Sequence, residues 1–263
     1  MTETTALDSA HAAMTAAPDD DGARLRFYER LADSELFLML TKEAEDGNIS
    51  PEMFELADGT FVLLFDREER LAQFADRVVP YAALSGRVVA QMLAGQGIGL
   101  GLNLEVAPSS ILIPAEAVSW LHQTLEHRPD QVEAAISEIL PPAGLPEVLL
   151  TALDSKLATA TGLAVSAYLV SVRYAGGGQG HLLGFVDATE AAQSALAKAA
   201  GEALTFSGIE AGAMDVGFFA STDAMTAKLD KVGLRFDLPQ PEEPKLYQPE
   251  IPGSNPDKPP LLK

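Results

Sequence analysis

The stretch MFELADGTFVLLFD, from Met53 to Asp66, constrains the fold more than any other part of this chain. Two apolar runs meet there at Asp58-Gly59, a dipeptide that readily adopts the positive φ angles of a tight hairpin turn. The run ELFLMLTK at residues 35–42 supplies a third apolar strand, and a helix is expected to begin at Asp66. A lone hairpin is barely stable in water, whereas three strands and a helix can share one core. This stretch therefore predicts the centre of a domain in which a sheet packs against helices.

Further helices and strands are predicted on both sides of this hairpin. The spacing of apolar residues predicts helices over residues 6–17, 23–33 and 85–94. Residues 111–125 have the pattern of a strand followed by a helix, with Pro114 near the first turn, where its missing N–H costs little. Trp120, the only tryptophan, is expected to anchor this helix to the core.

The second half of the chain shows a similar mixture of helices and strands. Residues 128–145 contain several prolines and predict a linker with one short acidic helix. The run at 162–174 is apolar on both faces and predicts the central strand of a second sheet. Beyond residue 237, prolines alternate with charged residues, which is typical of an extended tail.

These patterns predict an α+β protein of two consecutive domains, each with a mixed or mostly antiparallel sheet packed by helices. A length of 263 residues is sufficient for two such domains. The predicted parts are an N-terminal extension with a short helix at 1–22, a first domain at 23–127, the linker at 128–145, a second domain at 146–237 and a Pro-rich tail at 238–263.

The charge balance excludes several classes of function. The chain has 18 Lys and Arg against 38 Asp and Glu, a formal net charge of −20. Nucleic acids and anionic membranes require basic surfaces, so neither is an expected partner. The chain has no cysteine, which excludes disulfides, thiolate zinc sites and cysteine nucleophiles. Without a signal-like N-terminus or a long apolar run, the protein is expected to be soluble and cytoplasmic.

Two acidic sequences have the form of a helix capping box, Asp66 to Glu69 and Asp187 to Glu190. Capping is the preferred interpretation of these carboxylates. For acid–base chemistry the carboxylates to consider are Asp187 and Asp215, although a hydrogen-bonded structural role is the expected one for Asp215. The sequence predicts no catalytic residues, no cofactor and no metal site.

A run of alternating glycines, at residues 95, 97, 99 and 101, precedes the strand and helix predicted at residues 111–125. Their spacing fits neither the dinucleotide-binding fingerprint nor the phosphate-binding P-loop. Gly97, Gly99 and Gly101 share one face of a strand that ends at Asn103, and this face carries no side chains. Close packing inside the domain is the preferred interpretation. The alternative is a groove for a partner or a ligand, formed by Gly97, Gly99, Gly101 and Asn103.

Three segments in this order resemble the SseB family of bacterial proteins, named for enhanced serine sensitivity: FYERLADSELFLML, MFELADGTFVLLFDREERLAQF and GIGLGLNLEVAPSSILIPAEAVSWL. In the second half, LAVSAYLVSV and MDVGFF are similar to the C-terminal domain of that family, in a more divergent form. The resemblance implies two domains and carries over no catalytic residue.

The leading functional hypothesis is a non-enzymatic cytoplasmic interaction or regulatory protein that binds a protein partner through the glycine strand or the tail. The alternative is a protein that binds an amino-acid metabolite, or an enzyme linked to serine metabolism, as the family name suggests. A third hypothesis, a protein associated with type III secretion, comes from the family label alone.

Overall fold

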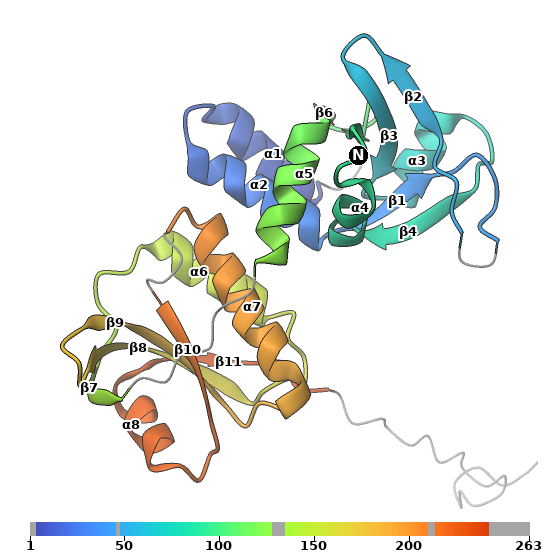
Figure 1. Cartoon of the computed structure of the whole chain (residues 1–263). Helices are drawn as coiled ribbons and strands as arrows, with labels where there is room; N and C mark the ends of the chain where they lie inside the picture. Colours follow the sequence, from blue (N-terminus) through green and yellow to red (C-terminus); the bar gives the residue numbers. More distant parts are fainter. Residues whose placement is uncertain (1–3, 46–47, 128–134, 210–213, 242–263) are drawn as a thin grey trace, which may run out of the picture.

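The computed structural model describes residues 4–45, 48–127, 135–209 and 214–241. These residues form two α+β units, which we call the first unit (4–127) and the second unit (135–241). In Figure 1 the first unit lies at the top of the view and the second below it. The predicted α+β class with two sheets is confirmed. Most of the predicted tail, 242–263, lies outside the described residues, as does 128–134 of the predicted linker.

The first unit contains one sheet and the helices that cover it (Figure 1). Its elements in chain order are α1 (Ala6–Ala16), α2 (Asp21–Asp33), β1 (Glu35–Met39), β2 (Met53–Leu56), β3 (Gly59–Phe65), α3 (Glu68–Ala75), β4 (Tyr81–Ser85), α4 (Gly86–Leu93), β5 (Ile98–Leu102), β6 (Ile111–Ile113) and α5 (Ala115–Glu126).

The sheet of the first unit has the strand order β4-β1-β3-β5-β6, and β2 also pairs with β3. All pairs are antiparallel except β3 and β5, which are parallel. The predicted hairpin is confirmed as β2 and β3, with a φ angle of 135° at Gly59 in its turn. Strand β4 was not predicted, because its residues directly precede the expected helix. Ser85 ends this strand and caps α4, since its hydroxyl accepts the N–H of Val88 at 3.4 Å.

Strand β3 places alternate side chains in two separate cores. Val62 and Leu64 face α1, α2, α4 and α5, whose apolar residues form the larger core. Leu63 and Phe65 face the short helix α3, where Leu71 is buried with them. This alternation follows from the two-residue period of a strand, and it makes β3 the element on which both cores depend.

Both predicted capping boxes are wrong. Helix α3 has Arg67 at its N-cap and no side-chain capping bond, and the Asp66 carboxylate accepts from Thr5 at 2.6 Å and from Arg70 at 2.8 Å instead. Helix α7 (Glu190–Phe206) has Thr189 at its N-cap, again without a side-chain bond. Asp187 has a φ angle of 52° and accepts the N–H of Ser221 at 2.8 Å instead. In both places the carboxylate reaches a partner more distant than the local motif assumes.

A capping box does occur at the start of α1, where it is part of a buried charged network. Thr5 and Asp8 cap each other through bonds of 2.9 and 3.1 Å. Arg70 on α3 pairs with Asp8 at 2.5 Å and with Asp66 at 2.8 Å, and all three side chains are at most 4% exposed. The sequence places α1 in an N-terminal extension, whereas this network joins it to the body of the first unit.

The same network sets the ionisation of Asp8. Burial alone would raise the pKa of Asp8, but hydrogen bonds from Arg70, Ser109 and the Thr5 backbone hold it well below its ordinary value. A lowered pKa means that the stabilisation is present above the pKa of the unfolded chain and is lost as the pH falls. The network therefore belongs to the neutral-pH form of the protein.

The second unit contains a second sheet with helices on both faces (Figure 1). Its elements are β7 (Ile136–Leu140), α6 (Glu147–Leu157), β8 (Ser166–Tyr174), β9 (Gln179–Val186), α7 (Glu190–Phe206), β10 (Met214–Phe219), α8 (Ala224–Val232) and β11 (Leu234–Asp237). The strand order is β10-β9-β8-β11, and β7 also pairs with β8. The central position predicted for β8 is confirmed, and β8 pairs with β9 in the antiparallel direction. The parallel pair of this sheet is β9 and β10.

Two segments differ from the boundaries expected from the sequence. Residues 136–140 are strand β7 of the second sheet, so the short acidic helix predicted for this part of the linker is wrong. After β11 the chain stays on the second unit, with Leu238 buried. Pro239 accepts the N–H of Gly162 at 2.8 Å, and Gln240 donates to the carbonyl of Ala164 at 3.0 Å. The first residues of the predicted tail therefore belong to the second unit.

Arg70→Met tests the buried network directly. The substitution leaves two carboxylates buried without their cation, so we expect the free energy of unfolding to fall by about 3–5 kcal/mol. Urea denaturation at neutral pH measures this loss. Arg24→Met is the control, because Arg24 forms an exposed pair with Asp21 and its loss is expected to cost less than about 1 kcal/mol. Equal losses in the two variants would contradict the role assigned to Arg70.

Candidate functional site

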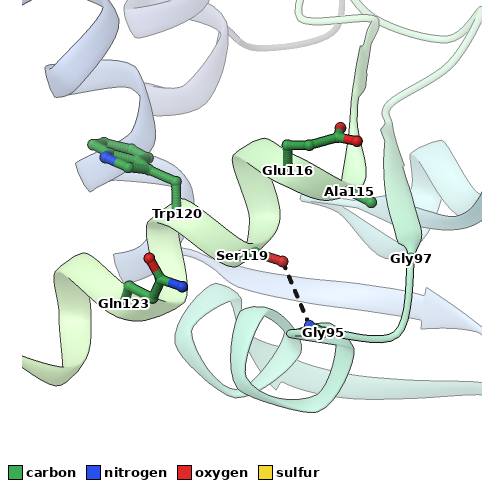
Figure 2. Close-up of a pocket in the computed structure, with 7 residues that line it drawn as sticks. All are labelled: Gly95, Gly97, Ala115, Glu116, Ser119, Trp120 and Gln123. Carbon is green, nitrogen blue, oxygen red and sulfur yellow. Dashed lines mark hydrogen bonds between the residues drawn. The ribbon is translucent and has the colours of Figure 1, made fainter.

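An open hollow of about 350 Å³ lies between helix α5 and the turn that leads into β5 (Figure 2). The turn contributes backbone, and the helix contributes side chains of mixed chemistry. The lining residues are Gly95, Gly97, Ala115, Glu116, Ser119, Trp120 and Gln123.

The turn side of the hollow requires glycine. Gly95 and Gly97 have φ angles of 74° and 71°, in the left-handed region that residues with a Cβ rarely adopt. A Cβ on either residue would meet nothing within 4 Å, so the space beside the turn is open. The N–H of Gly95 donates to the hydroxyl of Ser119 at 3.4 Å, drawn as the dashed line in Figure 2. This bond ties the turn to α5 and leaves bare backbone at the rim.

The helix side of the hollow is one stripe of α5. Ser119 and Trp120 lie three and four residues after Glu116, and Gln123 lies four and three residues after them. This spacing places all four side chains on one helix face. The opposite face of α5, with Val118, Leu121 and Leu125, is buried in the core. The apolar spacing of α5 therefore leaves this stripe to the solvent.

Trp120 is the unexpected member of that stripe. It is not the buried anchor predicted from the sequence, because its side chain is 38% exposed and the neighbouring Leu121 takes the core position. The indole packs edge-on against the ring of Tyr28 on α2, with the ring centroids 5.3 Å apart. The stripe thus presents an aromatic surface that is held on one side and open on the other.

Glu116 lies one helical turn before Trp120 and is exposed. Within the described part of the chain it has no cationic partner. A carboxylate and an exposed indole on the same face are the two groups that bind a cationic side chain, by charge pairing and by cation–π contact.

The residues of the predicted glycine groove do not lie together around one opening. Gly97 lines the hollow, but Gly99 and Gly101 are buried. A Cβ on Gly99 would lie 2.6 Å from the carbonyl oxygen of Ile113, and one on Gly101 would lie 2.6 Å from the side chain of Leu63. Side chains of the same unit therefore cover this face of β5.

Asn103, the fourth predicted groove residue, belongs to the buried network instead. Its φ angle is 46° and its side chain is fully buried. The Asn103 amide donates to Ser109 at 2.8 Å, and its oxygen accepts the N–H of Asp66 at 3.1 Å. Ser109 in turn donates to Asp8 at 2.6 Å. Asn103 therefore links the end of β5 to α1 and α3.

The carboxylates considered for acid–base chemistry both have partners in the second unit. Asp187 follows β9 and accepts a backbone N–H, as described above. Asp215 on β10 accepts the hydroxyl of Tyr174, and burial together with this bond raises the pKa of the tyrosine. In the described ranges, no group of three His, Asp or Glu side chains is arranged to hold a metal ion. Of the helices in those ranges, none has the length and apolar character needed to cross a membrane.

Gly99→Ala tests whether this face of β5 is packed. The added methyl group would clash with backbone, so we expect a loss of about 1–3 kcal/mol in the free energy of unfolding. Gly176→Ala is the matched control, since a Cβ there meets open space. Thermal denaturation of both variants gives the comparison. A Gly99→Ala protein as stable as the control would show that the face is open.

Comparison with known families finds a match for most of the first unit. Residues 8–120 match the family model described as the SseB protein N-terminal domain. No curated protein and no solved structure matches the chain at a significant level. The resemblance predicted for the first half is confirmed, and the resemblance of the second half to the C-terminal domain of that family stays a prediction.

Proposed function

We propose that this protein, whose residues 8–120 match the SseB protein N-terminal domain, is a non-enzymatic cytoplasmic interaction protein whose hollow beside α5 binds a basic segment of a protein partner. The exposed indole of Trp120, one turn from the carboxylate of Glu116, is the observation that carries the proposal. Tryptophan is enriched among the residues that dominate binding energy at protein interfaces.

The two groups favour a lysine or arginine side chain in the hollow. A cation over an indole gains about 0.5–1 kcal/mol at an exposed site and more when it is desolvated. Arginine suits the position best, since its planar guanidinium can stack on the indole while its charge is attracted to the Glu116 carboxylate, which points away from the indole in Figure 2. The Tyr28 contact holds the indole in place before binding, which reduces the entropy lost on association.

The charge of the whole chain supports the same kind of partner. A net charge of −20 creates a negative potential that attracts basic segments and repels acidic ones. Attraction of this kind speeds association and selects partners more than it adds affinity. The bare backbone at Gly95 and Gly97 leaves room for the main chain of the bound segment.

The alternative function, an amino-acid metabolite binder or enzyme, would draw on Asp187 and Asp215. Both carboxylates already have hydrogen-bond partners within the second unit. This observation favours the interaction protein over the enzyme.

The single tryptophan makes the proposal directly testable. Titration with an oligoarginine peptide is expected to change the emission of Trp120 and to reach saturation, whereas oligoglutamate of equal length leaves it unchanged. Glu116→Gln removes the paired charge and should weaken oligoarginine binding by about 3- to 10-fold, which corresponds to about 0.7–1.4 kcal/mol. Equilibrium fluorescence at physiological salt gives both dissociation constants.

Glu69→Gln is the control for non-specific attraction, because it removes one exposed negative charge from α3, outside the lining of the hollow. Binding by this variant should match that of the unmodified protein. If Glu116→Gln and Glu69→Gln weaken binding equally, the peptide senses only net charge and the proposed site is wrong.

A further inference from the structure

The two units meet at a partly buried cluster of five charged side chains, which we call the latch: Glu29, Lys156 and Glu202 are at most 13% exposed, and Asp33 and Arg87 are 27% and 33% exposed. The first unit supplies Glu29 and Asp33 from α2 and Arg87 from α4, and the second supplies Lys156 from α6 and Glu202 from α7. We propose that the latch is a protonation switch, in which uptake of one proton by Glu29 tightens the contact between the units and its release loosens it. This inference does not depend on the partner proposed above.

Arg87 makes the main connection between the units. Its two terminal nitrogens donate to the two oxygens of Glu202, each at 2.6 Å. The same guanidinium also donates to Asp33 at 2.5 and 3.1 Å. Such a two-pronged arginine–carboxylate pair has a fixed geometry, so it sets how α7 lies against α2 and α4.

Lys156 is the second connection and is shared among three carboxylates. Its ammonium group lies 2.5 Å from Asp33, 3.2 Å from Glu202 and 3.4 Å from Glu29. The Glu29 oxygen nearest to Lys156 is inaccessible to solvent and has no hydrogen-bond partner among the described residues. Glu29 is therefore the least satisfied carboxylate of the latch.

The latch carries more negative than positive groups. Three carboxylates and two cations leave one uncompensated negative charge when all five are ionised. An uncompensated charge is costly beside the buried members of the latch, Glu29, Lys156 and Glu202, and one proton removes it. Among the described residues, Arg30 on the same helix also acts on Glu29, and its positive charge lowers the pKa of Glu29 less than Lys156 does.

The environment directs that proton to Glu29. Burial raises the pKa of Glu29, which Lys156 opposes and the charge of Asp33 reinforces. Burial also acts on Asp33, but Lys156 and Arg87 together lower the pKa of Asp33 below its ordinary value. Because the pKa of Glu29 is raised, its stabilisation of the contact is lost as the pH rises through that pKa. Because the pKa of Asp33 is lowered, its stabilisation of the contact is lost as the pH falls through that pKa. The contact is thus strongest between the lowered pKa of Asp33 and the raised pKa of Glu29.

The switch acts on a contact that also has an apolar part. Phe206 at the end of α7 is fully buried in the core of the first unit. This side chain keeps the units associated, while the charged groups determine how firmly α2 and α4 are held. Helix α2 also carries Tyr28, which packs on Trp120, so this helix contacts both the latch and one residue that lines the hollow.

Distance measurements between the units test the switch in the full chain. The protein has no cysteine, so Leu112→Cys and Leu234→Cys, at two residues each 40% exposed, give one spin label on each unit. Pulsed electron resonance over a pH series that begins at about pH 4, near the ordinary pKa of a glutamate, and extends to about pH 9 is expected to show a narrow distance distribution at the acid end that broadens as the pH rises.

Two variants decide what causes the broadening. Glu29→Gln imitates the protonated side chain, so its distribution should stay narrow across the whole range. Glu35→Gln, an exposed neighbour on β1, should behave like the unmodified chain. A distribution that never changes with pH, or one that broadens equally with Gln at position 29, would overturn the proposal.

Discussion

One buried guanidinium, that of Arg70, holds together the parts of the first unit that sheet pairing does not connect. It joins α1 to the end of β3 through Asp8 and Asp66. Asn103 and Ser109 extend the same network to the end of β5. Replacement of such a buried group by an apolar one is often tolerated when every charge is removed together, but the loss of one partner is severe. The network therefore specifies one arrangement of α1, α3 and the loop that leads to α5.

Charge has a different effect where the two units meet. The Arg70 network pairs its guanidinium with two carboxylates deep inside one unit, whereas in the latch Lys156 is shared among three carboxylates, two of which belong to the other unit. In the Arg70 network the carboxylate of Asp8 stays ionised near neutral pH, so the network keeps its charges there. Each cluster has one buried atom without a hydrogen-bond partner, the Nε of Arg70 in the first and an oxygen of Glu29 in the second, but only the Glu29 oxygen can take up a proton. One acidic chain thus contains a fixed and an adjustable charged cluster.

The elements with strong local signals were predictable from the sequence. The hairpin at Asp58-Gly59 and the doubly apolar strand β8 both occur where expected. Asp66 was assigned to a cap because the local motif fits, yet Arg70 at the i+4 position takes that carboxylate. That spacing was a usable signal for the pair. The partners Asp8 and Ser109 are 101 residues apart, and no local pattern reports such a contact.

The candidate site was predictable only in part for the same reason. The alternating glycines indicated a bare strand face, and the neighbouring side chains of Leu63 and Phe61 cover it. The open surface lies one turn earlier, at Gly95 and Gly97, where the φ angles demand glycine. The apolar character of Trp120 suggested burial, but helical spacing gives the core position to Leu121. Which of two adjacent apolar residues faces the core depends on how α5 docks.

The central claim is that Trp120 is open to solvent one helical turn from Glu116, a carboxylate with no cationic partner among the described residues. Quenching of its fluorescence by caesium, iodide and neutral acrylamide measures both the exposure and the sign of the local potential. The account predicts efficient quenching by acrylamide, stronger quenching by caesium than by iodide, and a reduced preference for caesium in Glu116→Lys. A tryptophan that acrylamide cannot reach, or that iodide quenches as well as caesium does, would contradict it.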